Sequence, residues 1–166
     1  MVDIYTNNDL STIMDEYGSN VLNTAYLYLK DKQLAEDVFQ EVFLKAYLKM
    51  NTFEFRSSVK TWLIRITINQ CKDAIKCAYQ KKVDVGLKEL DCTSDSVETV
   101  AEENLENEML YNNILSLEPK YREIVLLRYY NDLSLDEISE ILHISNGAVR
   151  TRLSRTTALL KRVMTE

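Results

Sequence analysis

The sequence is poor in the residues that form tight turns. Its 166 residues include only three Gly and one Pro. A protein built from many short strands needs such residues between the strands. Residues that favour helix, such as Leu, Glu, Lys and Ala, are common instead. We therefore predict an all-α fold.

Cysteine and histidine are also scarce. The three cysteines, Cys71, Cys77 and Cys92, form no C-x-x-C pair and are accompanied by a single histidine. This composition indicates neither a disulfide framework nor a zinc site, so we expect reduced thiols, no bound metal and no cofactor. A glycine-rich phosphate loop and a cluster of catalytic residue types are absent from the sequence, and we expect no enzymatic activity.

Long apolar runs are missing as well. No stretch approaches the roughly 20 apolar residues that a membrane-spanning helix needs. Residues 1–5 do not show the basic and apolar regions of a signal peptide. We therefore expect a cytoplasmic protein.

The charges are unevenly distributed along the chain, whose net charge is −6. Residues 55–82 carry seven basic side chains and one acidic one, a net charge of +6, and residues 143–166 carry five and one, a net of +4. Between them, residues 83–118 contain one Lys and ten acidic residues, a net of −9. Two basic blocks around an acidic one suit a protein with two phosphate-binding surfaces. Solvated helix faces of mixed sign would give the same pattern.

Apolar residues at helical spacing predict three helices in the first part of the chain. Residues 10–47 carry two apolar stripes, the second ending at Tyr47, which should pack against each other. A third helix follows, with Ser57 or Ser58 as its N-cap. These helices would form one small domain over residues 1–78.

A change of composition separates this domain from a second one. Residues 79–103 lose the apolar periodicity and gather acidic and hydroxyl residues, which is typical of a flexible acidic linker. The second domain, residues 104–166, begins with a helix near Met109. Another helix follows from Pro119, since proline is tolerated in the first turn.

A helix-turn-helix pattern follows in the second domain. Ser134 and Glu137 fit a capping box that begins one helix, and Ser145 can cap the next helix after a turn at His143. Apolar residues fall where the two helices would pack together: Ile138, Leu142, Ile144, Val149 and Leu153. The second of these helices would be a recognition helix for the major groove. A helical hairpin without DNA contacts would give a similar pattern.

Four segments carry more specific motifs. Residues 35–47 read AEDVFQEVFLKAY, residues 57–69 read SSVKTWLIRITIN, residues 117–129 read LEPKYREIVLLRY, and residues 147–155 read GAVRTRLSR. In this order they resemble conserved regions 2 and 4 of the extracytoplasmic-function (ECF) sigma factors of bacterial RNA polymerase. The resemblance covers nearly the whole chain, and two domains joined by an acidic linker match the minimal plan of that family.

This resemblance implies a function and partners. It implies an alternative sigma factor that binds core RNA polymerase, directs promoter-specific transcription initiation, melts the minus-10 element and reads the minus-35 element. It further implies an anti-sigma factor, often membrane-anchored, which would hold the otherwise cytoplasmic protein at the membrane. We expect the free protein to be a monomer.

Some positions depart from the family pattern. Ser139 stands where the family commonly has Ala, and His143 where it commonly has the Gly of the turn. Histidine tolerates the left-handed conformation better than most residue types. Ala148 stands where the family frequently has Thr, and the change removes a hydroxyl contact to DNA. Three residues before Trp62, this sequence has Val59 where the family usually has an aromatic residue. Lys76 stands where the family usually has Arg, and it keeps the charge but loses bidentate geometry.

The resemblance assigns the polymerase-binding face to the second predicted helix. Polar residues three or four apart form a stripe there: Asp37, Gln40, Glu41 and Lys45. The two acidic residues would pair with basic residues of the clamp coiled coil in the largest polymerase subunit. A solvated helix face is the alternative reading of the stripe.

The third predicted helix and the loop before it would bind the minus-10 DNA. The residues assigned to this site are Phe53, Lys60, Trp62, Arg65, Asn69, Lys72 and Lys76. The cations would bind phosphate and Asn69 would read a base edge or the backbone. Phe53 and Trp62 would brace a loop, residues 51–58, that holds an extruded base. The alternative interpretation is that each of these aromatic residues is only a core residue.

The predicted recognition helix would bind the minus-35 DNA. The residues assigned to it are Ser145, Asn146, Gly147, Ala148, Arg150, Thr151, Arg152 and Arg155. Arg150 is the candidate for a guanine edge, since Arg can donate two hydrogen bonds there. Thr151, Arg152 and Arg155 would hold phosphate. Ser145 and Asn146 would place the helix N-terminus, with its partial positive charge, near a phosphate.

Two other functions fit parts of the pattern. The chain would be a stand-alone helix-turn-helix regulator if its first domain were a sensing or dimerising bundle. It would be an interaction adaptor if it kept the sigma fold without binding DNA. The stripe on the second predicted helix and the basic third helix favour the sigma factor, because a sensor does not need them.

Overall fold

The computed structural model describes residues 7–86 and 105–165, which form two compact units, one on each side of residues 87–104. Within these two ranges the secondary structure is entirely helical. The predicted all-α fold is confirmed. No helix in the described ranges is long and apolar enough to cross a membrane.

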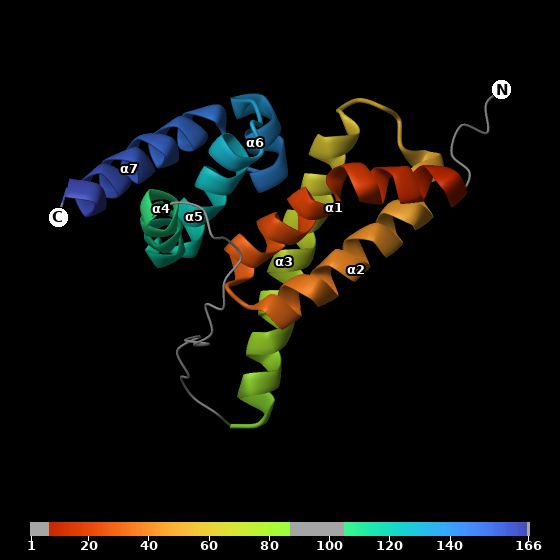
Figure 1. Ribbon diagram of the computed structural model, residues 1–166, viewed down its shortest axis with the longest axis horizontal. Coiled ribbons are helices and arrows are strands. Elements are labelled where there is room, and N and C mark those ends of the chain that lie inside the picture. Colours follow the sequence, from red (N-terminus) through yellow and green to blue (C-terminus); the bar gives the residue numbers. More distant parts are fainter. Residues whose placement is uncertain (1–6, 87–104, 166) are drawn as a thin grey trace. The chain divides into compact units, whose positions relative to one another are not determined.

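The first unit is a bundle of three helices (Figure 1). They are α1 (Asn7–Leu29), α2 (Lys32–Lys49) and α3 (Val59–Asp84), and each packs against the other two. A short 3₁₀ helix, η1 (Met50–Thr52), leads from α2 into the loop before α3. The C-terminal half of α3 projects beyond the other two helices of its unit.

Local hydrogen bonds set where these helices begin. The Asp31 side chain accepts from the Leu34 amide at 3.0 Å, which starts α2 directly after the end of α1. Of the two serines considered as the cap of α3, Ser58 fills the role, since its hydroxyl accepts from the Thr61 amide at 3.1 Å. The loop between η1 and α3 therefore ends at a fixed point.

The core of the first unit lies between the three helices. Its fully buried members include Val21, Val42, Leu63 and Ile68. Gly18 of α1 faces the Phe39 ring of α2, and an added Cβ there would lie in ordinary van der Waals contact, 3.6 Å from the ring. The apolar stripes of α1 and α2 thus pack together as predicted.

Tyr47 was predicted to end the buried stripe of α2, and this is wrong. Tyr47 is 47% exposed, and its neighbours Leu44 and Leu48 are 53% and 67% exposed. Residues three or four apart share one face of a helix. Tyr47 therefore belongs with Leu44 and Leu48, on the face of α2 that points away from the core.

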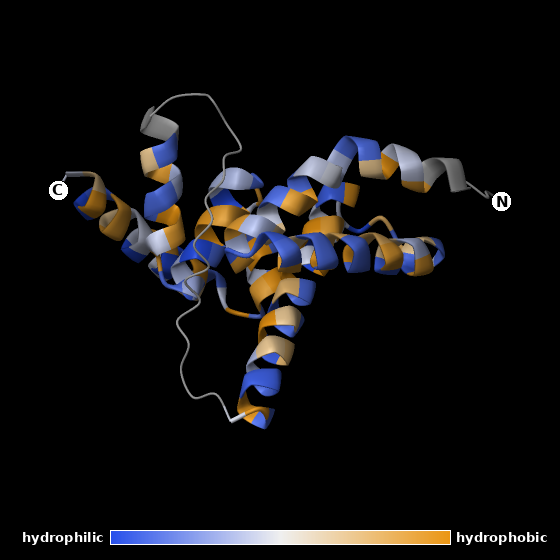
Figure 2. Cartoon of the chain, turned by 60° about the horizontal axis from the view of Figure 1, so that its bottom comes forward, coloured by the Kyte–Doolittle hydropathy of each residue, from blue (hydrophilic) through white to orange (hydrophobic). Residues whose placement is uncertain are grey.

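Helix α3 is also longer than predicted. It continues past Ala78 to Asp84, so the first residues of the expected linker are helical. Lys81 and Lys82 lie in the last turn, where cations interact favourably with the helix dipole, and Gln80 donates to Asp84 at 3.2 Å. Figure 2 shows mixed polar and apolar residues along this projecting part. The linker residues 87–103 lie outside the described part.

The second unit consists of four α-helices and one π-helical turn in the described part of the chain. They are α4 (Leu105–Ser116), α5 (Pro119–Val125), the π turn η2 (Leu126–Tyr130), α6 (Leu135–Leu142) and α7 (Asn146–Thr165). Helix α7 packs against α4, α5 and α6. With 20 residues it is the longest of these helices.

Buried polar side chains hold the turns of the second unit. Arg122 is only 6% exposed, and its Nη1 donates to the carbonyl oxygens of Leu115 and Leu117 at 3.3 and 3.2 Å. Buried Asn131 donates from Nδ2 to the Leu126 carbonyl at 2.9 Å. The Leu115 and Leu117 carbonyls lie at the end of α4, where helix carbonyls lack intrahelical partners. The Leu126 carbonyl lies at the start of the π turn and also accepts from the Asn131 amide at 3.0 Å. These bonds fix the helices that pack against α7.

Candidate nucleic-acid and polymerase interfaces

Hydrogen bonds hold the start of α6 and the turn between α6 and α7. The predicted capping box is present: the Ser134 amide donates to Glu137 Oε2 at 2.8 Å, and the Glu137 amide donates to Ser134 Oγ at 3.2 Å. His143 ends α6 in the left-handed conformation, with φ 54°, as the turn requires. Ser139, at a position where Ala was expected, donates its hydroxyl to the Ile144 carbonyl at 2.6 Å.

Three predicted DNA-binding residues near the start of α7 make hydrogen bonds within the protein, Ser145 and Asn146 at the turn and Thr151 inside the helix. Ser145 Oγ accepts from the Ala148 amide at 3.1 Å and so caps the helix. Asn146 Nδ2 donates to Asp136 Oδ1 of α6 at 2.6 Å, and Thr151 Oγ1 donates to the Gly147 carbonyl at 2.9 Å. These polar groups position the recognition helix, a role that the sequence reading did not separate from DNA contact.

Two of the predicted DNA-binding arginines of α7, Arg150 and Arg155, are exposed. Counting about 100° per residue, they lie about 100° and 120° from buried Val149 on opposite flanks of the exposed side, and so about 140° from each other. Gly147 is exposed between these flanks, next to the start of the helix, whereas Ala148 and Arg152 are half-buried. The two exposed arginines therefore border the outer face of α7, and Arg152 lies nearer the packed side.

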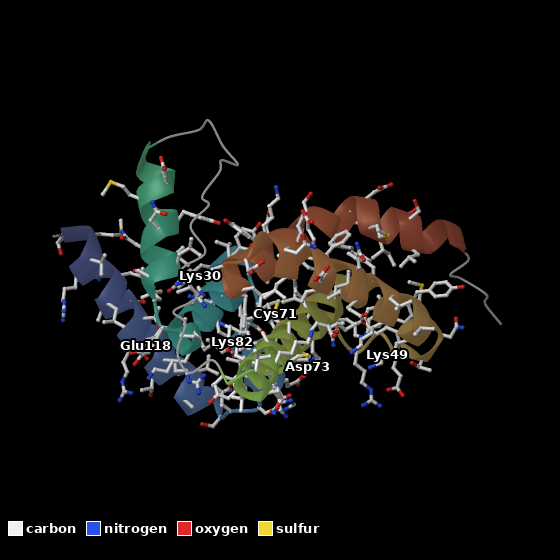
Figure 3. All side chains as sticks on the ribbon, turned by 90° about the horizontal axis from the view of Figure 1, so that it is seen from below. Lys30, Lys49, Cys71, Asp73, Lys82 and Glu118 are labelled. Carbon is white, nitrogen blue, oxygen red and sulfur yellow. The ribbon has the colours of Figure 1, made fainter. Side chains whose placement is uncertain are left out.

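The basic residues of α3 gather on one face. Arg65, Asn69, Lys72 and Lys76 fall within about 60° of one another around the helix at about 100° per residue. Asn69, Lys72 and Lys76 are exposed, and Arg65 is half-buried. Lys60 does not join them, because it lies in the first turn on a different side. Buried Cys71 (labelled in Figure 3) is on the inner side of the same helix.

Three aromatic rings contact one another in a row where the loop meets α3. The Phe53 and Trp62 ring centroids are 4.6 Å apart with 23° between their planes. Phe55 lies on Phe53 at 4.6 Å and 49°. Phe53 and Trp62 are half-buried, and Phe55 is 57% exposed. We call these three residues the aromatic stack.

Phe55 was not among the residues singled out from the sequence. The signal that would have found it is the pair Phe53 and Phe55 two positions apart, in a loop directly before Trp62. Trp62 lies within about 80° of every member of the basic face of α3, counting about 100° per residue. The aromatic stack and the basic face are therefore continuous.

Helix α2 presents the third candidate surface. Asp37, Gln40 and Glu41 are exposed, and Lys45 is half-buried at the edge of the same stripe. Asp37 accepts a long hydrogen bond of 3.4 Å from Gln33. The exposed Leu44 continues the stripe toward the end of the helix. The stripe is thus a mixed acidic and apolar surface.

The thiols of the first unit are structural or solvent-facing. Burial raises the pKa of the Cys71 thiol to about 12, so it stays protonated and unreactive. Cys77 is a free, exposed thiol, and Cys92 lies outside the described residues. Nowhere in the described ranges do three His, Cys, Asp or Glu side chains form a group that could hold a metal ion.

Comparison with known proteins connects these surfaces to a family. The family models for Sigma-70 region 2 and Sigma-70, region 4 match residues 13–80 and 107–160. The ECF RNA polymerase sigma factor SigW of Bacillus subtilis (strain 168) is 34% identical over 164 residues, which cover 90% of this chain and 86% of SigW. The chain belongs to the ECF RNA polymerase sigma factor family. It is an alternative sigma factor that directs promoter-specific transcription initiation.

Further relatives of this ECF sigma factor agree with that assignment. The ECF sigma factor SigM of Bacillus subtilis (strain 168) is 30% identical, over 89% of this chain and 93% of SigM. Among solved structures, the sigma factor RpoE from Bartonella quintana, in complex with the anti-sigma factor NepR, has the same fold. The TM-score is 0.83 at 20% identity, over 95% of this chain and 97% of RpoE.

Proposed function

We propose that this sigma factor uses three separate surfaces during initiation. The outer stripe of α2 binds core RNA polymerase, the aromatic stack with the basic face of α3 binds the minus-10 DNA, and the outer face of α7 binds the minus-35 DNA. The observation that carries this proposal is the continuity of the aromatic stack with the basic face of α3. It combines stacking groups with phosphate-binding groups, as single-stranded DNA requires.

The α2 stripe suits a protein partner with basic residues. Asp37 and Glu41 lie four residues apart on one exposed face, so one surface can meet both. The neighbouring Leu44 adds exposed apolar area, which interfaces bury at their centre. Gln40 and Lys45 would contribute polar contacts at the edge.

The α3 face suits a melted strand. Arg65, Lys72 and Lys76 would follow the phosphate backbone, and Asn69 lies between them where it would meet a base edge or the backbone. Phe53 and Trp62 would brace the loop that holds an extruded base. Lys60, on another side of the helix, would contact phosphate from the first turn.

The α7 face suits duplex DNA. Arg150 would donate two hydrogen bonds to a guanine edge in the major groove, and Arg155 would bind phosphate. Thr151, Gly147 and half-buried Ala148 and Arg152 would line the contact. Ser145 and Asn146, which hold the turn, would place the helix N-terminus and its free amides near a phosphate.

The domain plan and the inhibitor are part of the same proposal. The first domain carries the polymerase and minus-10 surfaces, and the second the minus-35 surface, with the linker beginning after α3 rather than at residue 79. RpoE and the sigma factor CnrH were solved as complexes with NepR and with the cytosolic domain of CnrY. By analogy, this protein would act in the cytoplasm as a monomer without enzymatic activity. An anti-sigma factor would inhibit it, and would hold it at the membrane if the inhibitor is anchored there.

The test is binding to bacterial core RNA polymerase, followed by selection of promoter sequences by the complex and by the chain alone. We expect tight core binding, with promoter opening only in the complex. The double change Asp37→Arg and Glu41→Arg should abolish core binding, because it reverses two charges on the proposed docking face.

The matched control makes the same charge change elsewhere. Asp15→Arg with Glu16→Arg alters two exposed residues of α1 and should leave core binding unchanged. If the unaltered chain ignores core polymerase and binds specific duplex DNA by itself, the sigma mechanism proposed here fails and a stand-alone regulator replaces it.

A further inference from the structure

A hydrogen bond between α6 and α7 joins Asp136 to Asn146. Asp136 lies in the first turn of α6, and Asn146 is the first residue of α7. Asn146 Nδ2 donates to Asp136 Oδ1 at 2.6 Å, and both residues are exposed. A hydrogen bond to an ionised carboxylate is shorter and stronger than one between neutral groups. The carboxylate therefore restrains a side chain that would otherwise rotate in solvent.

The carboxylate also decides which way round the Asn146 amide lies. An ionised carboxylate only accepts hydrogen bonds, so the NH₂ group must face Asp136 and the carbonyl oxygen must face away from it. The bond uses one of the two amide hydrogens. One donor and one acceptor of Asn146 are left for a ligand.

Asn146 lies on the part of α7 that a DNA groove would receive. The N-terminal residues of a recognition helix contact base edges in the major groove. Asn146 and Arg150 are four residues apart and both exposed, and they lie about 40° apart around the helix at about 100° per residue. Among the bases, adenine presents N7 as an acceptor and N6 as a donor, which match the donor and the acceptor of an asparagine amide.

We propose that Asp136 is a positioning residue that turns the Asn146 amide toward the major groove, where Asn146 reads an adenine of the minus-35 element. The inference rests on the proposed function, which gives Asn146 only the placing of the helix N-terminus. Asp136 acts through Asn146 and does not contact the DNA. The adenine would lie near the guanine that Arg150 reads, because the two side chains share one side of α7.

The charge of Asp136 gives this arrangement a recognisable signature. A carboxylate near DNA repels the phosphates, so Asp136 lowers the affinity for every sequence while it raises the preference for one. Loss of the carboxylate should therefore leave the affinity for duplexes without the adenine unchanged or higher. A contact that only held the turn would behave differently, since loosening the recognition helix weakens binding to all sequences.

The experiment uses the complex of the full chain with core polymerase and a set of minus-35 duplexes in which each base pair is changed in turn. The original chain should prefer adenine at one position by about 5- to 150-fold, the range for one bidentate base contact. Asn146→Ala should remove this preference. Asp136→Ala should lower it by about 2- to 10-fold, the effect of losing one hydrogen bond.

Two further variants of α6 test the role of the carboxylate. Asp136→Glu keeps a carboxylate acceptor and should retain more of the adenine preference than Asp136→Ala. Glu140→Ala removes the other exposed acidic residue of α6, one turn along the helix, and is the matched control. It should leave the base preference at every position unchanged.

A double variant separates positioning from a general structural role. In the Asn146→Ala background, Asp136→Ala has no amide left to position, so the base preferences should not change further. If Asp136→Ala instead weakens binding to all duplexes equally and the adenine preference persists, Asp136 only holds the turn and the proposal is overturned.

Failure of this inference can be told apart from failure of the proposed function. If the complex with the original chain shows no base preference in any minus-35 duplex, the proposed minus-35 function fails, and this inference fails with it. If base preferences are present and Asn146→Ala alters none of them, this inference alone fails.

Discussion

The loop before α3 and the turn before α7 both present candidate DNA-binding residues, but they are held in different ways. At the turn, three side chains close hydrogen bonds with nearby groups: Ser139, Ser145 and Asn146. At the loop, stacked aromatic rings run from Trp62 to exposed Phe55. The turn therefore orients a rigid helix, whereas the loop exposes a π surface.

This difference matches the two forms of DNA that a sigma factor meets. Reading a duplex requires side chains placed in register with base edges, which a capped helix provides. Holding an unpaired base requires a flat apolar surface with phosphate-binding groups beside it. The contrast predicts that changes at the two sites have separable effects on stability and on the two kinds of DNA.

The largest effect on stability should come from Trp62→Ala. The change removes the ring that supports Phe53 and leaves part of the first unit unpacked, so we expect a loss of about 2 kcal/mol in the free energy of unfolding. Denaturant unfolding of the full chain measures it. Tyr79→Ala, an exposed residue of the same helix, should change stability by less than about 0.5 kcal/mol. Equal losses in the two variants would show that the stack does not support the loop.

Arg150→Ala should have the next largest effect, on DNA and not on folding. Loss of a two-bond contact to a base costs about 1–3 kcal/mol of discrimination and relaxes specificity at one base pair. Binding of the polymerase complex to a set of mutated minus-35 duplexes measures both quantities. Arg155→Ala should weaken binding uniformly across the set and reduce the salt dependence, because it removes a phosphate contact. A uniform loss for Arg150→Ala as well would exclude it as the base reader.

The smallest effect concerns the backbone of the turn. His143 has φ 54°, so His143→Gly should relieve strain and stabilise the chain by about 0.5–1 kcal/mol. Glu140→Gly, inside α6, should destabilise it by about 1 kcal/mol, because glycine is unfavourable within a helix. Minus-35 binding by His143→Gly should stay within about twofold, since the turn is held by hydrogen bonds on both sides. Weaker binding despite higher stability would show that His143 itself contributes to recognition.

The sequence was most informative where short-range rules determine structure. Ser134 and Glu137 lie three residues apart before an apolar run, and this pattern alone predicted the capping box that forms. The core between α1 and α2 followed from helical spacing in the same way. Such features depend on neighbours within a few residues, which the sequence shows directly.

Features that depend on the third dimension were missed. Tyr47 fits the apolar period of α2, yet it is exposed, because the width of the buried stripe depends on how α1 and α3 pack. The role of Asn146 in the turn depends on Asp136, ten residues earlier on another helix. The contact of Phe55 with Phe53, and its positive φ, appear only in the folded loop.

The most direct test of the account is a crossed binding experiment with two variants and two probes. Complexes of core polymerase with Trp62→Ala or Arg150→Ala are titrated with a single-stranded minus-10 oligonucleotide and with a minus-35 duplex. The account predicts that Trp62→Ala weakens only single-strand binding and Arg150→Ala only duplex binding, each by about tenfold or more. If either variant weakens both probes equally, the two surfaces do not divide the two forms of DNA between them.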